Sequence, residues 1–166
     1  MAKSLNIKIV SLLPAASEML CDLGLIDNIH AVSHECNYPE LLKDKIQITS
    51  SNIPNNIEQK LIDDLVSEAI KNKLPLYNID TDKLNNINPD LIITQGLCDV
   101  CSISEHEIEV TLKNKRCILS SKSKIISLNG TSFDEICSDF LKVGKLVDKE
   151  DVCLLYTSDA ADDAPC

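Results

Sequence analysis

The amino-acid sequence predicts an α/β fold in which a mostly parallel sheet is flanked by helices. Short runs rich in β-branched residues alternate with segments in which apolar residues recur at helical spacing. Strands that alternate with helices in this way form parallel sheets that are covered on both faces. The chain has 166 residues, of which 44% are hydrophobic and 25% are charged. We therefore expect an ordinary globular domain with a substantial core.

The predicted strands are short runs dominated by Ile, Leu and Val. Residues 6–11 open the fold, and residues 90–94 have the pattern of a buried strand. The complete predicted set comprises residues 6–11, 28–33, 76–79, 90–94, 116–120 and 124–128. Residues 34–56 contain two prolines and are expected to form a long connection.

Helix signals separate these runs. Pro14 stands where the first turn of a helix tolerates proline, and Gly24 can end that helix just after its C-cap. Apolar residues at helical spacing predict an amphipathic helix over residues 57–70. A helical turn at residues 84–87 is stopped by Pro89.

Two capping boxes mark further helix starts. Ser104 with Glu107 opens a short helix, and Ser132 with Glu135 opens a longer one. The apolar spacing of the second helix continues to about Val152, which predicts roughly 20 residues of helix, or some 30 Å.

The composition disfavours several classes of partner. The chain has 16 basic and 26 acidic residues, a net charge of −10. A negative charge of this size repels nucleic acid and anionic membranes. Aromatic residues make up only 3% of the chain, so stacking platforms for bases are scarce. No apolar run approaches the roughly 18 residues of a membrane span, and we expect no direct membrane insertion.

The sequence lacks the motifs of the common enzyme classes. It has no Walker loop, no glycine-rich dinucleotide fingerprint, no nucleophile elbow and no paired catalytic carboxylates. With four glycines in the chain, a phosphate cradle is not expected either. We therefore expect no enzyme of these classes.

Three loops that follow predicted strands have unusual content. They are residues 12–18, where a helix begins, residues 33–39 and residues 94–102. Because the carboxyl ends of parallel strands share one edge of a sheet, and ligands bind in the crevice there, we expect these loops to form one site. The free N–H groups at the start of the first helix would contribute to it.

These loops carry a family resemblance. In order, Val-Ser-Leu-Leu-Pro-Ala-Ala-Ser-Glu, Ser-His-Glu-Cys-Asn-Tyr-Pro and Pro-Asp-Leu-Ile-Ile-Thr-Gln resemble the substrate-binding proteins of iron-complex and cobalamin ABC importers. The Cys-x-x-Cys that follows Thr-Gln is similar to the cobalamin-binding subgroup. The resemblance spans residues 7–149. It implies two α/β lobes joined by one long helix, with the ligand in the cleft between them.

The resemblance also implies domain boundaries and ligand contacts. Residues 1–130 would form the N-terminal ligand-binding lobe, and residues 131–152 the start of the inter-lobe helix. A corrinoid such as cobalamin, or a related metal chelate, would bind in the cleft and pass to an ABC permease, with no covalently bound cofactor. The imidazole of His34 could reach the cobalt or iron of such a chelate. The residues expected to line this half of the cleft are Pro14, Ala16, Ser17, His34, Tyr38, Gln95 and Cys98.

The cysteines leave a second interpretation open. Cys98 and Cys101 form a single Cys-x-x-Cys, and a zinc site needs two further ligands. His34 and Cys36 could supply them from a loop at the same sheet edge. The alternative function is therefore a cytosolic metal-binding or redox protein that uses these four residues, with zinc as its metal. An enzymatic role in corrinoid salvage is a third option.

Residues 153–166 differ from the rest of the chain. They contain no Ile, Lys or Asn, residue types that are abundant before them. They can be back-translated in frame into a transposase adapter that is used in sequencing libraries. We interpret them as a translated adapter that makes few core contacts, and the authentic chain as a fragment.

The start of the chain bears on its location. A secretory signal needs an apolar stretch of about 7–15 residues and a small-residue cleavage site, and neither precedes residue 6. As written, the sequence predicts a cytoplasmic protein whose eight cysteines are thiols or ligands rather than disulfides. If an upstream start codon restores a signal peptide, the location becomes periplasmic or extracytoplasmic.

Overall fold

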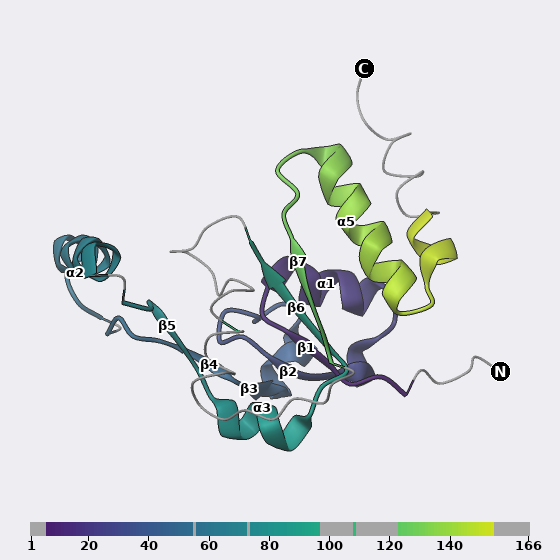
Figure 1. Ribbon diagram of the computed structural model, residues 1–166, viewed down its shortest axis with the longest axis horizontal. Coiled ribbons are helices and arrows are strands. Elements are labelled where there is room, and N and C mark those ends of the chain that lie inside the picture. The colour runs from purple at the N-terminus through teal and green to yellow at the C-terminus, as the bar shows by residue number, and fades with distance from the viewer. Residues whose placement is uncertain (1–5, 55, 73, 97–107, 109–122, 155–166) are drawn as a thin grey trace.

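A parallel five-stranded sheet is the centre of the fold. The computed structural model describes residues 6–54, 56–72, 74–96, 108 and 123–154. The strand order is β3-β2-β1-β6-β7, and every neighbouring pair is parallel. This confirms the predicted α/β class (Figure 1). The strands are β1 (Ile9–Ser11), β2 (Ile29–Val32), β3 (Ile46–Gln47), β6 (Leu91–Gln95) and β7 (Lys124–Leu128).

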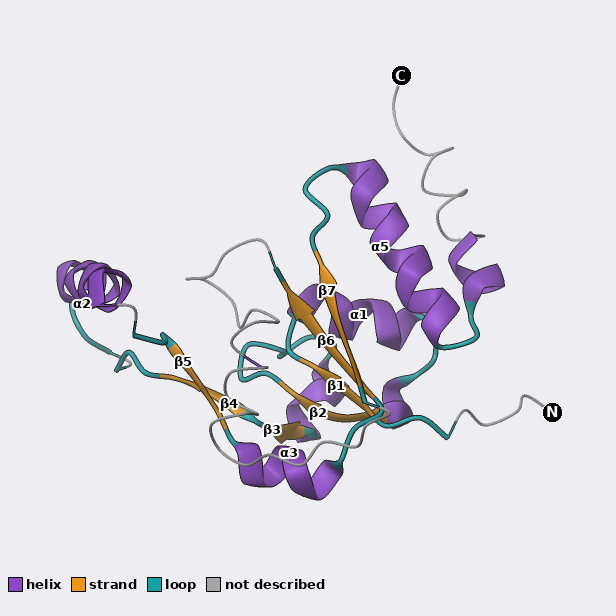
Figure 2. Cartoon of the chain, viewed as in Figure 1, coloured by secondary structure: helices purple, strands orange, loops and turns teal. Residues whose placement is uncertain are grey.

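Helices cover both faces of this sheet. The helix α1 (Pro14–Asp22) and the helix α5 (Phe133–Leu146) pack on one face, in a core shared with Ile9 and Ile93. The helix α3 (Thr81–Ile87) packs on the other face, in a core shared with Ile92. Alternate residues of one strand therefore enter different cores, as strand geometry requires. Figure 2 shows helices on both sides of the sheet.

A two-stranded antiparallel sheet extends from the main sheet as an arm. It pairs β4 (Thr49–Ser51) with β5 (Tyr77–Ile79), and the helix α2 (Gln59–Asn72) connects them. Figure 1 shows α2 at the far end of this arm, and no residue of α2 is buried. We call β4, α2 and β5 the arm.

The local signals located most elements correctly. Pro14 is the first residue of α1, and Gly24 follows its C-cap with φ of 71°, a left-handed conformation that glycine adopts freely. The side chain of Ser132 accepts a hydrogen bond from the backbone N–H of Glu135, as the capping box predicts. The predicted helix at Ser104 and the predicted strand at residues 116–120 lie outside the described residues.

Residues 34–56 contain more structure than a long connection. A 3₁₀ helix at Glu40–Asp44 precedes β3 and β4. The sequence did not reveal β3 because it has only two residues, both exposed. It did not reveal β4 because Thr-Ser-Ser carries no apolar residue.

The last helix ends earlier than predicted. It stops at Leu146 and not near Val152, and Asp148 adopts a left-handed conformation with φ of 51°. The chain then turns back in a short helical segment, residues 150–154. Of the helices that the structure describes, none is long and apolar enough to cross a membrane.

Cys153 packs into the core beside this turn. It is fully buried, its Sγ lies 3.5 Å from the carbonyl oxygen of Phe140, and Gly144 leaves the space that its Sγ occupies. The expectation that residues 153–166 make few core contacts is therefore wrong at Cys153. Residues 155–166 lie outside the described part of the chain.

Candidate functional site

The candidate site is the carboxyl edge of the five-stranded sheet. The strands β2, β1 and β6 are neighbours and run parallel, so the segments that follow them meet at one edge. Pro14 and His34 follow the first two of these strands, and Gln95 is the last residue of β6. The topology confirms that the ends of these three strands, where the three loops begin, share one edge. Cys98 and Cys101 lie outside the described residues.

The first loop turns directly into α1. Leu13 is the N-cap and makes no side-chain capping hydrogen bond, and Pro14 is the first residue of the helix. The first backbone N–H with a partner inside the helix is that of Ser17, which donates to the carbonyl oxygen of Leu13 at 3.0 Å. The first-turn N–H groups before Ser17 have no carbonyl partner within the helix, as at every helix start.

His34 is held by residues of the arm. The Oγ1 atom of Thr49 lies 2.9 Å from the backbone nitrogen of His34 and 2.7 Å from its ring Nδ1. The ring of Tyr77 lies 5.7 Å from the imidazole, centroid to centroid, at an interplanar angle of 48°. The imidazole itself is half-buried. The sequence contains no motif that joins His34 to Thr49 or Tyr77, and both partners were missed.

Beneath this edge lies a buried cluster of hydroxyl groups and a thiol, which we call the serine–cysteine cluster. Its members are Ser11, Ser17, Ser33 and Cys36, all buried. The Oγ of Ser17 lies 2.8 Å from the Oγ of Ser11 and 3.3 Å from the Sγ of Cys36. The Oγ of Ser33 lies 3.5 Å from the same sulfur. The cluster joins the loops after β1 and β2.

This burial separates the predicted site residues into two groups. The side chains of Ala16 and Ser17 are fully buried and pack below the edge. In contrast, the Tyr38 side chain is 67% exposed, and Pro14 and Gln95 are half-buried. Ala16 and Ser17 thus support the loops from below. Pro14, His34, Tyr38 and Gln95 are at least partly exposed at the edge.

The structure does not favour the predicted metal site. Cys36 is 1% exposed and its thiol lies among serine hydroxyls. Among the described residues there is no group of three or more His, Cys, Asp or Glu side chains that could hold a metal ion. The predicted ligands Cys98 and Cys101 fall outside that part of the chain.

The start of the third loop, at Gly96, is hydrogen-bonded to the segment that follows β7. The Oδ1 atom of Asn129 accepts a hydrogen bond from the backbone N–H of Gly96 at 2.9 Å. The carboxylate of Asp139 on α5 accepts hydrogen bonds from the backbone N–H groups of Asn129 and Gly130, both at 2.8 Å. Asp139 of α5 therefore holds the segment at Asn129, and Asn129 in turn holds Gly96 at the end of β6.

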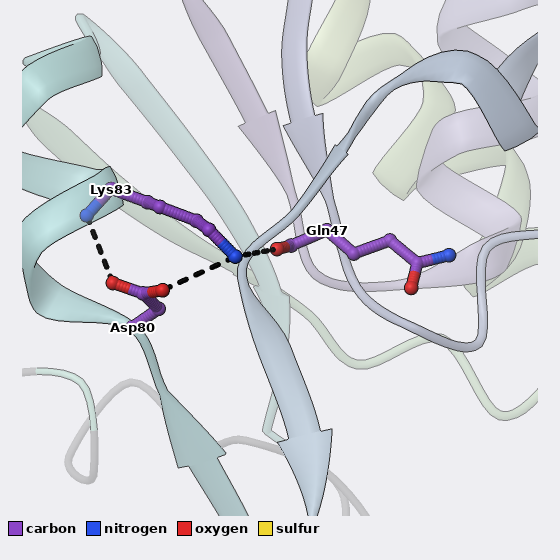
Figure 3. Close-up of polar contacts among 3 residues, drawn as sticks. All are labelled: Gln47, Asp80 and Lys83. Carbon is purple, nitrogen blue, oxygen red and sulfur yellow. Dashed lines mark hydrogen bonds and ion pairs between the residues drawn. The ribbon is translucent and has the colours of Figure 1, made fainter.

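A polar depression of about 300 Å³ lies between β4, β5 and the start of α3. Figure 3 shows the polar contacts of two of its charged residues, Asp80 and Lys83. The Nζ of Lys83 donates to the carbonyl oxygen of Gln47 at 3.1 Å and lies 3.2 Å from Oδ2 of Asp80. The backbone N–H of Lys83 donates to Oδ1 of Asp80, which lowers the pKa of that carboxyl group. Asp80 is thus the N-cap of α3, and the Lys83 ammonium links this cap to Gln47 of β3.

The fold is similar to that of solved periplasmic binding proteins. No protein-family model matches the chain, and no curated protein matches it. A possible iron-binding, periplasmic solute-binding protein from Staphylococcus epidermidis is similar in structure, with a TM-score of 0.61 and 22% identity. The match covers 93% of this chain and 47% of that protein. The chain has the fold of one periplasmic-binding-protein lobe.

Two further solved structures share this lobe. The periplasmic vitamin B12 binding protein of Vibrio cholerae has a TM-score of 0.60 and 18% identity, over 92% of this chain and 46% of that one. A periplasmic heme binding protein from Pseudomonas aeruginosa has a TM-score of 0.63 and 12% identity, over 93% and 43%. The chain thus spans about half the length of the proteins that its lobe matches.

Proposed function

We propose that this periplasmic-binding-protein lobe binds a metal chelate at its sheet edge and serves an ABC importer as part of its substrate-binding protein. The observation that carries the proposal is the meeting of the Pro14, His34 and Gln95 segments at one carboxyl edge. In open parallel sheets, ligands bind at this edge. The role is capture and delivery, without catalysis.

The ligand class rests on two kinds of support. The structural neighbours include proteins named for iron, vitamin B12 and heme, which are metal ions or chelates of them. The loop sequences after β1, β2 and β6 resemble the iron-complex and cobalamin importer family, and the Cys-x-x-Cys that follows Thr94-Gln95 resembles its cobalamin-binding subgroup. We therefore propose a corrinoid or a related chelate as the ligand, and a location outside the cytoplasm, as for these neighbours.

The edge has the groups that a large, partly apolar ligand needs. Tyr38 offers an exposed aromatic ring, and Pro14 adds apolar surface. His34 and Gln95 add polar groups, and a small number of these fixes a ligand's orientation. We propose that Cys98 belongs to the same surface, and that Ala16, Ser17 and Cys36 act from below by holding the loops.

The magnitude of binding can be estimated. A ligand that two lobes bind with a micromolar dissociation constant has a binding free energy of about 8 kcal/mol. If one lobe supplies half of the contacts, its binding free energy is about 4 kcal/mol. We therefore expect this chain to bind with a dissociation constant in the millimolar range. The whole substrate-binding protein would bind about a thousandfold more tightly.

Calorimetry with cyanocobalamin tests the proposal. We expect millimolar binding by the chain, and weaker binding by His34→Ala and by Tyr38→Ala. The matched control is His30→Ala. His30 lies on β2, the strand that precedes the His34 loop, and its Nδ1 contacts the carbonyl oxygen of Asn28 at the other end of that strand. Equal weakening by His30→Ala, or no heat at millimolar cyanocobalamin, would reject a corrinoid at this edge. Titration with hemin under the same conditions tests the wider chelate class.

A further inference from the structure

Two contacts between His34 and Thr49 pass through one oxygen atom. The Oγ1 of Thr49 lies 2.9 Å from the backbone nitrogen of His34 and 2.7 Å from ring Nδ1. A backbone N–H can only donate, so Oγ1 accepts that hydrogen bond. Thr49 is 7% exposed, and a buried hydroxyl needs an acceptor for its own proton.

The hydrogen-bonding capacity of Thr49 decides which ring nitrogen is protonated. Within the part of the chain that the structure describes, Oγ1 has these two His34 atoms as its polar partners and no others. If Nδ1 carried a proton, Oγ1 would accept twice and its own proton would have no acceptor among the described groups of the chain. If Nδ1 is unprotonated, the hydroxyl donates to it and every group is paired. The second arrangement is the favourable one.

We propose that neutral His34 carries its ring proton on Nε2, and that it binds the ligand as an N–H donor to an oxygen atom rather than as a ligand of its metal. This proposal rests on the proposed function, since it names the chemistry of a contact within that site. The ring of Tyr77, tilted by 48° against the imidazole, fixes the plane in which Nε2 is presented. Thr49 is thus the positioning residue for His34.

The proposal defines the part of the ligand that His34 contacts. A histidine that ligates a metal donates a hydrogen bond through its other ring nitrogen to a carboxylate or carbonyl oxygen. Thr49 imposes the opposite arrangement, in which that other nitrogen accepts. The complementary group is therefore an oxygen acceptor, such as an amide carbonyl or a carboxylate at the rim of a macrocyclic chelate.

Nuclear magnetic resonance of the ring nitrogens tests the protonation directly and needs no ligand. In the chain labelled with ¹⁵N-histidine, His34 is assigned by the signals that disappear in His34→Gln. We expect a protonated Nε2 and an unprotonated Nδ1 in the neutral ring, and the same pattern in Thr49→Ser, which keeps the hydroxyl. In Thr49→Val, the Nδ1 signal should move toward that of a freely exchanging histidine. A protonated Nδ1 in the wild-type chain, or no change in Thr49→Val, would overturn the proposal.

Absorbance with aquocobalamin tests the contact. Exchange of the cobalt-bound water for an imidazole shifts the visible spectrum, so metal ligation by His34 would be seen directly. We expect aquocobalamin to bind the wild-type chain without this shift, and to bind Thr49→Val more weakly. A shift that disappears in His34→Gln would overturn the proposal. Absence of any binding heat would instead count against the corrinoid function, and the ring-nitrogen result would still decide the tautomer.

Discussion

Asn129 accepts a hydrogen bond from the backbone N–H of Gly96 at 2.9 Å, which fixes the end of β6 to the end of β7. Gly96 directly follows Gln95, so this contact holds the start of the third site loop from the segment after a neighbouring strand. A side chain added at Gly96 would lie 2.6 Å from the Asn129 oxygen, which shows how closely the two segments approach.

Removing this acceptor should weaken both the loop and the site. We expect Asn129→Ala to lower the free energy of unfolding by about 1 kcal/mol, the usual net value of a hydrogen bond, and to weaken chelate binding. Asn129→Asp keeps an oxygen at the same place and is the matched control. Urea unfolding and calorimetry measure the two effects. Unchanged stability and binding in Asn129→Ala would show that Gly96 does not depend on this contact.

The close packing of Gly144 and Cys153 gives a second prediction. A β-carbon at Gly144 would overlap the Sγ of Cys153. We expect Gly144→Ala to destabilise the chain by about 1–3 kcal/mol, as overpacked cores do. Addition of Cys153→Ala should recover part of this loss, because the sulfur is gone. If the two changes are simply additive in thermal unfolding, Cys153 does not pack on Gly144.

The serine–cysteine cluster predicts different effects for two substitutions of one residue. Cys36→Ala leaves the buried hydroxyls of Ser17 and Ser33 without their sulfur partner, and we expect a loss of about 1–3 kcal/mol in the free energy of unfolding. Cys36→Ser keeps a polar partner and should lose less. Because Cys36 is 1% exposed, iodoacetamide should label it only after unfolding. Rapid labelling of Cys36 in the native chain, seen by peptide mass spectrometry, would contradict this burial.

The N-terminal cap of α3 predicts a pH dependence. The backbone N–H of Lys83 donates to Asp80 and lowers the pKa of its carboxyl group. A lowered pKa in the folded state means that this stabilisation is present above the unfolded value, about 3.9, and is lost as the pH falls below it. We expect Asp80→Ala to cost about 1 kcal/mol at pH 7.

Asp80→Asn separates the cap from its charge. Asparagine caps helices as well as aspartate, so stability at pH 7 should be retained, while the contribution of position 80 to acid sensitivity disappears. Urea unfolding at pH 7 and at pH 3 measures both variants. An unchanged loss of stability between these pH values in Asp80→Asn would place the acid-sensitive group elsewhere.

Local signals explain why much of the fold could be predicted. The start of α1 follows from Pro14 and its end from Gly24, because both act through backbone conformation within a few residues. The end of α5 could not be predicted in this way. The apolar spacing continues through the buried Val147, and the helix is ended by the left-handed Asp148 and by the packing of Cys153 on Gly144.

The candidate site, too, could be predicted only in part. The shared edge follows from the parallel direction of the strands, which the alternation of strands and helices predicted. The partners of His34 could not be predicted from the sequence, because Thr49 and Tyr77 belong to short strands of the arm and contact His34 only in the folded chain. Burial also reassigned Cys36, which the sequence presents as a potential ligand and the structure places among serines.

Chemical-shift mapping of the ¹⁵N-labelled chain with cyanocobalamin tests the central claim most directly, because it locates the ligand residue by residue. Binding at the sheet edge should move the amide signals of Ala15, His34 and Gln95, and should leave those of α2 unchanged, since α2 lies at the far end of the arm. Shifts confined to α2 or α3, or none at millimolar cyanocobalamin, would contradict a chelate-binding sheet edge.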